Sequence, residues 1–161
     1  MTVRKQPRPT RATRPIATRY TVDASVFVNA FNPHEDGHAE SLRILSAIQE
    51  REDPVIVPAL LVPEIAAAVA RATGDTAGAV EYARAAGALP HLTLVSLTPA
   101  VARQAADLAA THRLRGADAI YVAVARRYGT TIVSRDTEQR TRGAAVVSCH
   151  TPEEALEALR S

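Results

Sequence analysis

The sequence YTVDASVFVNA, at residues 20–30, changes from the pattern of a short strand to that of an apolar helix at one acidic residue. A strand is expected over Arg19–Val22 and a helical turn over Ser25–Phe31. Asp23 lies at the junction. A strand that leads directly into a helix is the first half of a βαβ crossover, so this stretch predicts a parallel sheet.

The rest of the chain repeats this alternation of strands and helices. Further strands are expected over Val55–Val57, Leu92–Leu97, Thr130–Ser134 and Ala145–Ser148. Helices are expected over Glu35–Arg51, Glu64–Thr73, Thr76–Ala88, Pro99–Leu114 and Ala117–Tyr128, with a last one from Pro152. In the first of these helices, Leu42, Leu45 and Ile48 form one apolar face. Helices of this length between strands predict a three-layer α/β/α sandwich with a mostly parallel central sheet of about five strands.

The charges of the chain are distributed unevenly. Residues 1–19 carry six of the 19 Lys and Arg side chains and no acidic one, so the remainder has more acidic than basic groups. Pro7, Pro9 and Pro15 oppose a helix there. We therefore expect residues 1–18 to be a disordered basic tail and residues 19–161 to form one domain. The tail is either an electrostatic arm for nucleic acid or a solvated extension.

Composition excludes several classes of protein. Cys149 is the only cysteine, which excludes an internal disulfide and a cysteine-based zinc cluster. The sequence contains no run of about 18 apolar residues, so no membrane span is predicted. The N-terminal charges are not followed by the apolar core of a secretory signal. A cytoplasmic protein is expected.

Four acidic residues are predicted to meet at one edge of the sheet. Asp23 follows the first strand directly, and Asp136 comes two residues after the fourth. Glu64 and Asp118 each lie in the first turn of a predicted helix. The carboxyl ends of parallel strands and the N-termini of the following helices share one edge, which is where such sheets bind ligands.

Two of these acids lie among apolar neighbours that disfavour a charge. Asp118 interrupts ADAIYVAVA, and Glu64 lies within LLVPEIAAAVA. Burial of an unpaired carboxylate is costly, and a bound divalent cation would offset that cost. With oxygen ligands alone, the expected ion is Mg²⁺ or Mn²⁺. Hydrolysis of a phosphodiester by an activated water is the matching chemistry.

Four motifs in order resemble the pattern of the PIN-domain ribonuclease family over about residues 20–150. They are VDASVFVNA around Asp23, VPEIAAAVAR around Glu64, RGADAIYVAVARRYG around Asp118 and TTIVSRD around Asp136. The chain looks closest to the branch that holds the toxins of VapBC-type toxin–antitoxin pairs. The resemblance implies an Mg²⁺- or Mn²⁺-dependent endoribonuclease that cleaves RNA, forms a homodimer and is inhibited by a small antitoxin.

The resemblance also implies roles for single residues. Asp23, Glu64 and Asp118 match the metal ligands of the family, and Asp136 matches a fourth, more variable acid. Ser25 and Ser134 match hydroxyl positions that support the site. The long basic segment before the first strand departs from the compact toxins.

Other interpretations stay open at this point. The chain could be a PIN domain that binds RNA or acts as a scaffold without turnover, or a housekeeping RNA-processing nuclease. Asn29 could meet substrate, although a surface position is preferred. Arg126, Arg127 and Arg135 could contact phosphates or simply be solvated.

Overall fold

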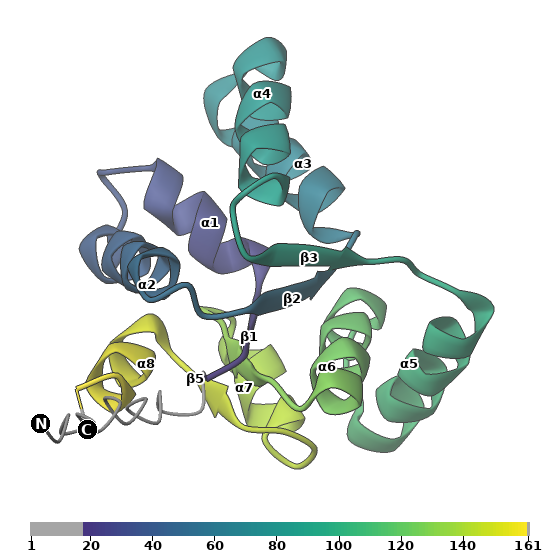
Figure 1. Cartoon of the computed structure of the whole chain (residues 1–161). Helices are drawn as coiled ribbons and strands as arrows, with labels where there is room; N and C mark the ends of the chain where they lie inside the picture. The colour runs from purple at the N-terminus through teal and green to yellow at the C-terminus, as the bar shows by residue number, and fades with distance from the viewer. Residues whose placement is uncertain (1–17, 161) are drawn as a thin grey trace, which may run out of the picture.

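The structure, a computed structural model, describes residues 18–160 and contains five strands and eight helices within them (Figure 1). The strands are β1 (Tyr20–Val22), β2 (Val55–Pro58), β3 (Leu92–Val95), β4 (Thr131–Val133) and β5 (Cys149–His150). The helices are α1 (Ala24–Phe31), α2 (His38–Glu50), α3 (Leu61–Thr73), α4 (Thr76–Gly87), α5 (Pro99–His112), α6 (Gly116–Tyr128), α7 (Thr137–Gly143) and α8 (Pro152–Ala158). The tail predicted over residues 1–18 lies, except for its last residue, outside the described residues.

All five strands are parallel and follow the order β3-β2-β1-β4-β5. β1, the first described strand, is central; the sheet extends from it through β2 to β3, and the chain then crosses back to add β4 and β5 on the other side of β1. In the register of the central pair, Val22 of β1 lies opposite Val133 of β4. The order reverses between β1 and β4, so ligands are expected beyond the carboxyl ends of these two strands.

Two apolar clusters lie on the two faces of the sheet, as the alternation of side chains along a strand requires. One cluster joins Val22, Val57 and Val133 to helices α1, α2, α3, α4 and α8. The other joins Ile132 of β4 to α5 and α6. Helices therefore cover both faces, and the predicted three-layer sandwich is confirmed. Among the described helices, none has the length and apolarity needed to cross a bilayer.

Side chains that cap helices fix where several helices begin. Asp23 caps α1 by accepting from the Ser25 amide, and Asp136 caps α7 by accepting from the Gln139 amide. Such a cap satisfies one backbone donor that the first turn leaves unpaired. Asp23 follows β1 and Asp136 follows β4, the two strands that flank the switch point. The residues that begin these helices therefore also place two carboxylates at one edge of the sheet.

The fifth strand was predicted at the wrong residues. The structure places it at Cys149–His150, whereas Ala145–Ser148 was expected. The amides of Val146 and Val147 both donate to the Gly143 carbonyl at the end of α7, so they cannot join a ladder. Their side chains pack against the cluster formed by α5 and α6 instead.

The second helix also differs from its prediction. It begins at His38 rather than Glu35, because Gly37 adopts a left-handed conformation with φ of 78° at the N-cap. Ile44 and Ile48 are buried as part of its inner face, but Leu42 is 48% exposed. Ser41, the residue before Leu42, is buried instead, and its hydroxyl donates to Asn29 Oδ1. The inner face of α2 therefore runs through Ser41, Ile44 and Ile48, and Leu42 lies outside it.

Candidate active site

A cleft of about 730 Å³ lies at the carboxyl edge of the sheet, next to the switch point. All four acids singled out from the sequence, Asp23, Glu64, Asp118 and Asp136, line it. Other polar side chains along its wall are Ser25, Asn29, Glu35, Arg71, Arg115 and Arg135. The predicted convergence of the four acids at one edge is therefore what the structure contains.

Asp23 is the one buried residue among the four acids and is 8% exposed. Its Oδ2 accepts a hydrogen bond from the Ser25 amide at 2.9 Å. Its Oδ1 accepts from Nε2 of Gln139 at 3.2 Å. Each oxygen thus has one neutral donor, and since a carboxylate offers about four acceptor positions, half of them remain for a ligand.

Glu64 enters the cleft from the first turn of α3. Its Oε2 accepts from the hydroxyl of Tyr121 at 2.7 Å. Burial raises the pKa of Glu64 above its ordinary value, and the nearby charges of Asp23 and Asp118 add to the effect, while the tyrosine hydrogen bond opposes it. The side chain is held in place by a neutral donor and forms no ion pair with any residue that the structure describes.

Asp118 projects from the first turn of α6. Its Oδ2 is buried and has no hydrogen-bond partner within residues 18–160. Burial, followed by the charges of Asp136 and Asp23, raises the pKa of Asp118 to about 6. A buried oxygen without a donor and with two carboxylates nearby is the arrangement that a cation would stabilise.

Asp136 lies at the mouth of the cleft. Its Oδ1 accepts from the Gln139 amide at 2.9 Å, and its Oδ2 lies 3.5 Å from the guanidinium of Arg115. Arg115 in turn pairs with Glu138 at 2.7 Å. Asp136 therefore has a guanidinium partner, whereas Asp23, Glu64 and Asp118 form no ion pair with a described residue.

The two serines support the loop that carries Asp136. Ser134 is fully buried, and its Oγ accepts from the Asp136 amide at 3.0 Å. Ser25 Oγ accepts from the Arg135 amide at 3.0 Å and lies 3.5 Å from Ser134 Oγ. These bonds connect the end of β4 to the start of α1, so the hydroxyls hold the loops and do not reach across the cleft to the acids.

Asn29 and Glu35 also line the cleft, although the sequence favoured a surface position for Asn29 and gave no sign of Glu35. Asn29 is 5% exposed, so the surface position preferred for it is wrong. Its Nδ2 donates to Glu35 Oε2 at 3.2 Å and to the Asp36 carbonyl at 3.0 Å. This network brings a fifth carboxylate to the wall of the cleft. An asparagine within an otherwise apolar helix was the available signal.

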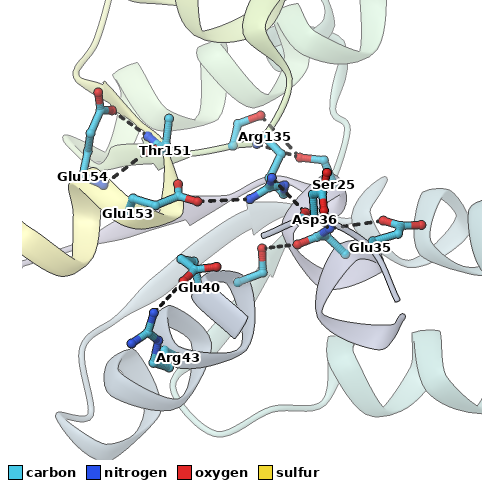
Figure 2. Close-up of polar contacts among 12 residues, drawn as sticks. Ser25, Glu35, Asp36, Glu40, Arg43, Arg135, Thr151, Glu153 and Glu154 are labelled. Atoms are coloured by element: carbon cyan, nitrogen blue, oxygen red, sulfur yellow. Dashed lines mark hydrogen bonds and ion pairs between the residues drawn. The ribbon is translucent and has the colours of Figure 1, made fainter. Parts of the chain in front are cut away.

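Arg135 is the arginine of the predicted set that reaches the cleft. Figure 2 shows its guanidinium between the Asp36 carbonyl and Glu153 of α8. The guanidinium donates to the Asp36 carbonyl at 3.1 Å and to Glu153 Oε1 at 3.5 Å. It lies over Gly37, where a Cβ atom would overlap it. Arg126 and Arg127 lie in the last turn of α6, about 12 Å along the helix axis from Asp118. Only Arg135 of these three is thus placed to contact a phosphate at the acids.

The side chains as they stand do not form a preassembled metal site. Within residues 18–160, no three His, Cys, Asp or Glu side chains are grouped closely enough to hold an ion. The donor set nevertheless fits a hard divalent cation, because it consists of carboxylate oxygens and includes the unpartnered Oδ2 of Asp118.

Comparison with known proteins agrees with this architecture. The family described as the PIN domain matches residues 20–145. VapC20 of Mycobacterium tuberculosis, described as a sarcin-ricin loop cleaving toxin, is 19% identical with a TM-score of 0.67, covering 78% of this chain and 95% of its own. PAE2754 of Pyrobaculum aerophilum is 19% identical with a TM-score of 0.65, covering 89% of this chain and 90% of its own.

A third similar structure is a toxin–antitoxin complex from Klebsiella pneumoniae. It is 18% identical to this chain with a TM-score of 0.58, covering 84% of this chain and 98% of its own. At such low identities, these likenesses establish a shared fold. No curated protein matches the chain.

Proposed function

This chain belongs to the PIN-domain family, and from that membership we propose that it is a divalent-metal-dependent endoribonuclease that hydrolyses RNA phosphodiester bonds. The observation that carries the proposal is the meeting of Asp23, Glu64, Asp118 and Asp136 in one cleft. Asp23, Glu64 and Asp118 form no ion pair within residues 18–160, and the buried Oδ2 of Asp118 has no donor there.

In this proposal Asp23, Glu64 and Asp118 hold the cation, Mg²⁺ or Mn²⁺, and Asp136 supports it from the mouth of the cleft. When bound, the cation supplies Lewis-acid chemistry for attack of water on a phosphodiester. The protein orients its ligands through neutral donors, the Ser25 amide for Asp23 and the Tyr121 hydroxyl for Glu64. Neutral donors leave the negative charge available, which a paired lysine or arginine would not.

The arginines at the rim would bind the backbone of the RNA. Arg71, Arg115 and Arg135 come from three separate elements and all line the cleft. Guanidinium groups form paired hydrogen bonds with phosphate oxygens. In the proposal they hold the phosphates on either side of the scissile bond, which overcomes the repulsion between an acidic site and a polyanion.

We further propose that the chain is the toxin of a toxin–antitoxin pair. Support comes from the fold shared with VapC20, which is described as a toxin, and with the Klebsiella toxin–antitoxin complex. The proposal includes a small antitoxin partner, a homodimer and a cytoplasmic location, as the family resemblance implies. A short DNA-binding protein encoded in the neighbouring gene would support it against a housekeeping RNA-processing nuclease.

The test is a Mn²⁺ titration of RNA cleavage by the purified chain, with Asp118→Asn as the inactive variant. Asp118→Asn is expected to lower kcat by about 10²–10³-fold or more, the scale of losing a group that stabilises the transition state, and to melt cooperatively. Asp107→Asn, on the exposed face of α5, is the matched control and should cleave like the parent.

Two results would contradict the proposal. Cleavage by Asp118→Asn at the parental rate would remove Asp118 from the chemistry. RNA binding that a chelator does not affect, together with no cleavage in any divalent metal, would instead identify an RNA-binding or scaffold domain.

A further inference from the structure

Gln139 is a fully buried residue beneath the cleft that contacts two of the four acids. Its side-chain Nε2 donates to Asp23 Oδ1 at 3.2 Å. Its backbone amide donates to Asp136 Oδ1 at 2.9 Å. One residue of α7 thus connects the acid that follows β1 with the acid that follows β4, across the switch point of the sheet.

The sequence spacing alone would give this glutamine a different role. Asp136-x-x-Gln139 has the spacing of a capping box, in which the side chain of the third residue returns to the amide of the cap. At the start of α8 the box closes in that way, since Glu154 accepts from the Thr151 amide (Figure 2). At α7 the Asp136 amide already donates to Ser134 Oγ. The Gln139 side chain is therefore free to reach Asp23.

The amide of Gln139 is costly where it lies. Its Oε1 is buried without a hydrogen-bond partner within residues 18–160, and a buried acceptor without a donor destabilises the fold. Reversing the amide would turn this oxygen toward the carboxylate of Asp23, so two acceptor oxygens would repel each other. A methionine would fill the same space without an unpaired atom. Packing therefore does not account for a glutamine here, but the hydrogen bond to Asp23 does.

We propose that Gln139 is a positioning residue that orients the Asp23 carboxylate to receive the cation. This inference rests on the proposed function. The Ser25 amide holds Oδ2, Gln139 holds Oδ1, and together they fix the rotation of the carboxyl group. Partners of ligating carboxylates typically change metal affinity or activity by about 10–100-fold when removed. A neutral amide orients the ligand without competing with the ion for its charge.

The test compares Gln139→Met with the parent in a Mn²⁺ titration, read by both melting temperature and RNA cleavage. We expect Gln139→Met to need about 10–100-fold more Mn²⁺ for half of the thermal shift and for half-maximal kcat. KM for RNA at saturating Mn²⁺ should match the parent. The control is Thr130→Val, which removes a buried hydrogen bond with Thr21 just before β4, at the opposite edge of the sheet. It should lower the melting temperature without moving the Mn²⁺ midpoint.

Each outcome decides one claim. An unchanged Mn²⁺ midpoint in Gln139→Met, with an active parent, overturns the positioning role and leaves the proposed function standing. A parent that neither shifts with Mn²⁺ nor cleaves RNA overturns both. If Gln139→Met does not melt cooperatively, Gln139→Asn carries the test, because it keeps the amide but withdraws it from Asp23, and the same weaker Mn²⁺ midpoint is expected.

Discussion

The hydroxyl of Tyr121 on α6 donates to Glu64 Oε2 on α3 at 2.7 Å, from a side chain that is fully buried. Burial, with the charges of Asp23 and Glu64, raises the pKa of Tyr121 far above its ordinary value, so the hydroxyl remains a donor at any working pH. Tyr121 lies three residues after Asp118 on the same helix. The position of α6 therefore determines both where the Asp118 carboxylate lies and which hydroxyl holds the Glu64 carboxylate.

Tyr121→Phe should weaken both the fold and the site. It removes one hydrogen bond to a carboxylate, and we expect the free energy of unfolding to fall by about 1–2 kcal/mol in urea titrations. The pKa of Glu64 should rise further, because the lost hydrogen bond opposed its shift. Cleavage of RNA should then require more Mn²⁺.

Tyr82→Phe is the matched control for this variant. Its hydroxyl donates to the Phe27 carbonyl, also at 2.7 Å, away from the acids. A comparable loss of stability with unchanged Mn²⁺ dependence is expected. If both variants change the Mn²⁺ dependence equally, Tyr121 acts only through the packing of the fold.

Asp118→Asn should stabilise the chain in chelator while removing activity. The substitution relieves a desolvated charge that lies close to Asp136 and Asp23. We expect a gain of about 1 kcal/mol in the free energy of unfolding, the scale of an unsatisfied buried polar group. With Mn²⁺ at about 100 times its Kd, the parent should gain about 2.7 kcal/mol and become the more stable of the two.

Denaturation curves in chelator and in Mn²⁺ check this reversal. Asp107→Asn should behave as the parent in both conditions. An Asp118→Asn variant that is less stable than the parent in chelator would show that this carboxylate stabilises the fold without a cation, contrary to the argument from its unpartnered oxygen.

Arg135→Ala should weaken RNA binding more than the chemical step. The guanidinium is held at the wall of the cleft by the Asp36 carbonyl and Glu153 (Figure 2). Losing one phosphate contact should raise KM by about tenfold and reduce the slope of log affinity against log salt by about 0.7 for single-stranded RNA. Steady-state kinetics at several salt concentrations measure both.

Arg126→Ala provides the comparison, because this arginine lies at the far end of α6. It should leave KM and its salt dependence as in the parent. A loss confined to kcat in Arg135→Ala would instead place the guanidinium at the reacting phosphate.

Cys149 should be nearly inert in the folded chain. Burial raises the pKa of its thiol to about 11, only partly offset by Arg140. The reactive thiolate is then about a thousandth of the population at pH 8, against about a quarter for an ordinary cysteine. In proportion to these thiolate fractions, alkylation by iodoacetamide at pH 8 should be about 250-fold slower in the native chain than in urea, and should accelerate as pH rises toward 11. Equal rates in both states at pH 8 would contradict the raised pKa.

Local patterns were sufficient for much of this protein. The alternation of strands and helices predicted the layered parallel fold, because each element is specified by its own periodicity and by caps such as Asp23 and Asp136. The meeting of the four acids in one cleft was also predicted from sequence, since a parallel sheet places strand ends and helix starts at one edge.

The tertiary structure decided the contacts between segments far apart in the chain. Gln139 has the spacing of a capping-box residue. Because the Asp136 amide already donates to Ser134 Oγ, the Gln139 side chain donates to Asp23 instead. Asn29 is buried because Ser41 and the Asp36 carbonyl come to it from another segment. A local turn accounts for the fifth strand, because the Gly143 carbonyl accepts from the amides of Val146 and Val147 and the strand begins only at Cys149. A buried polar group needs a hydrogen-bond partner, and which partner it finds depends on the groups that the fold brings near it. Sequence periodicity does not predict that proximity.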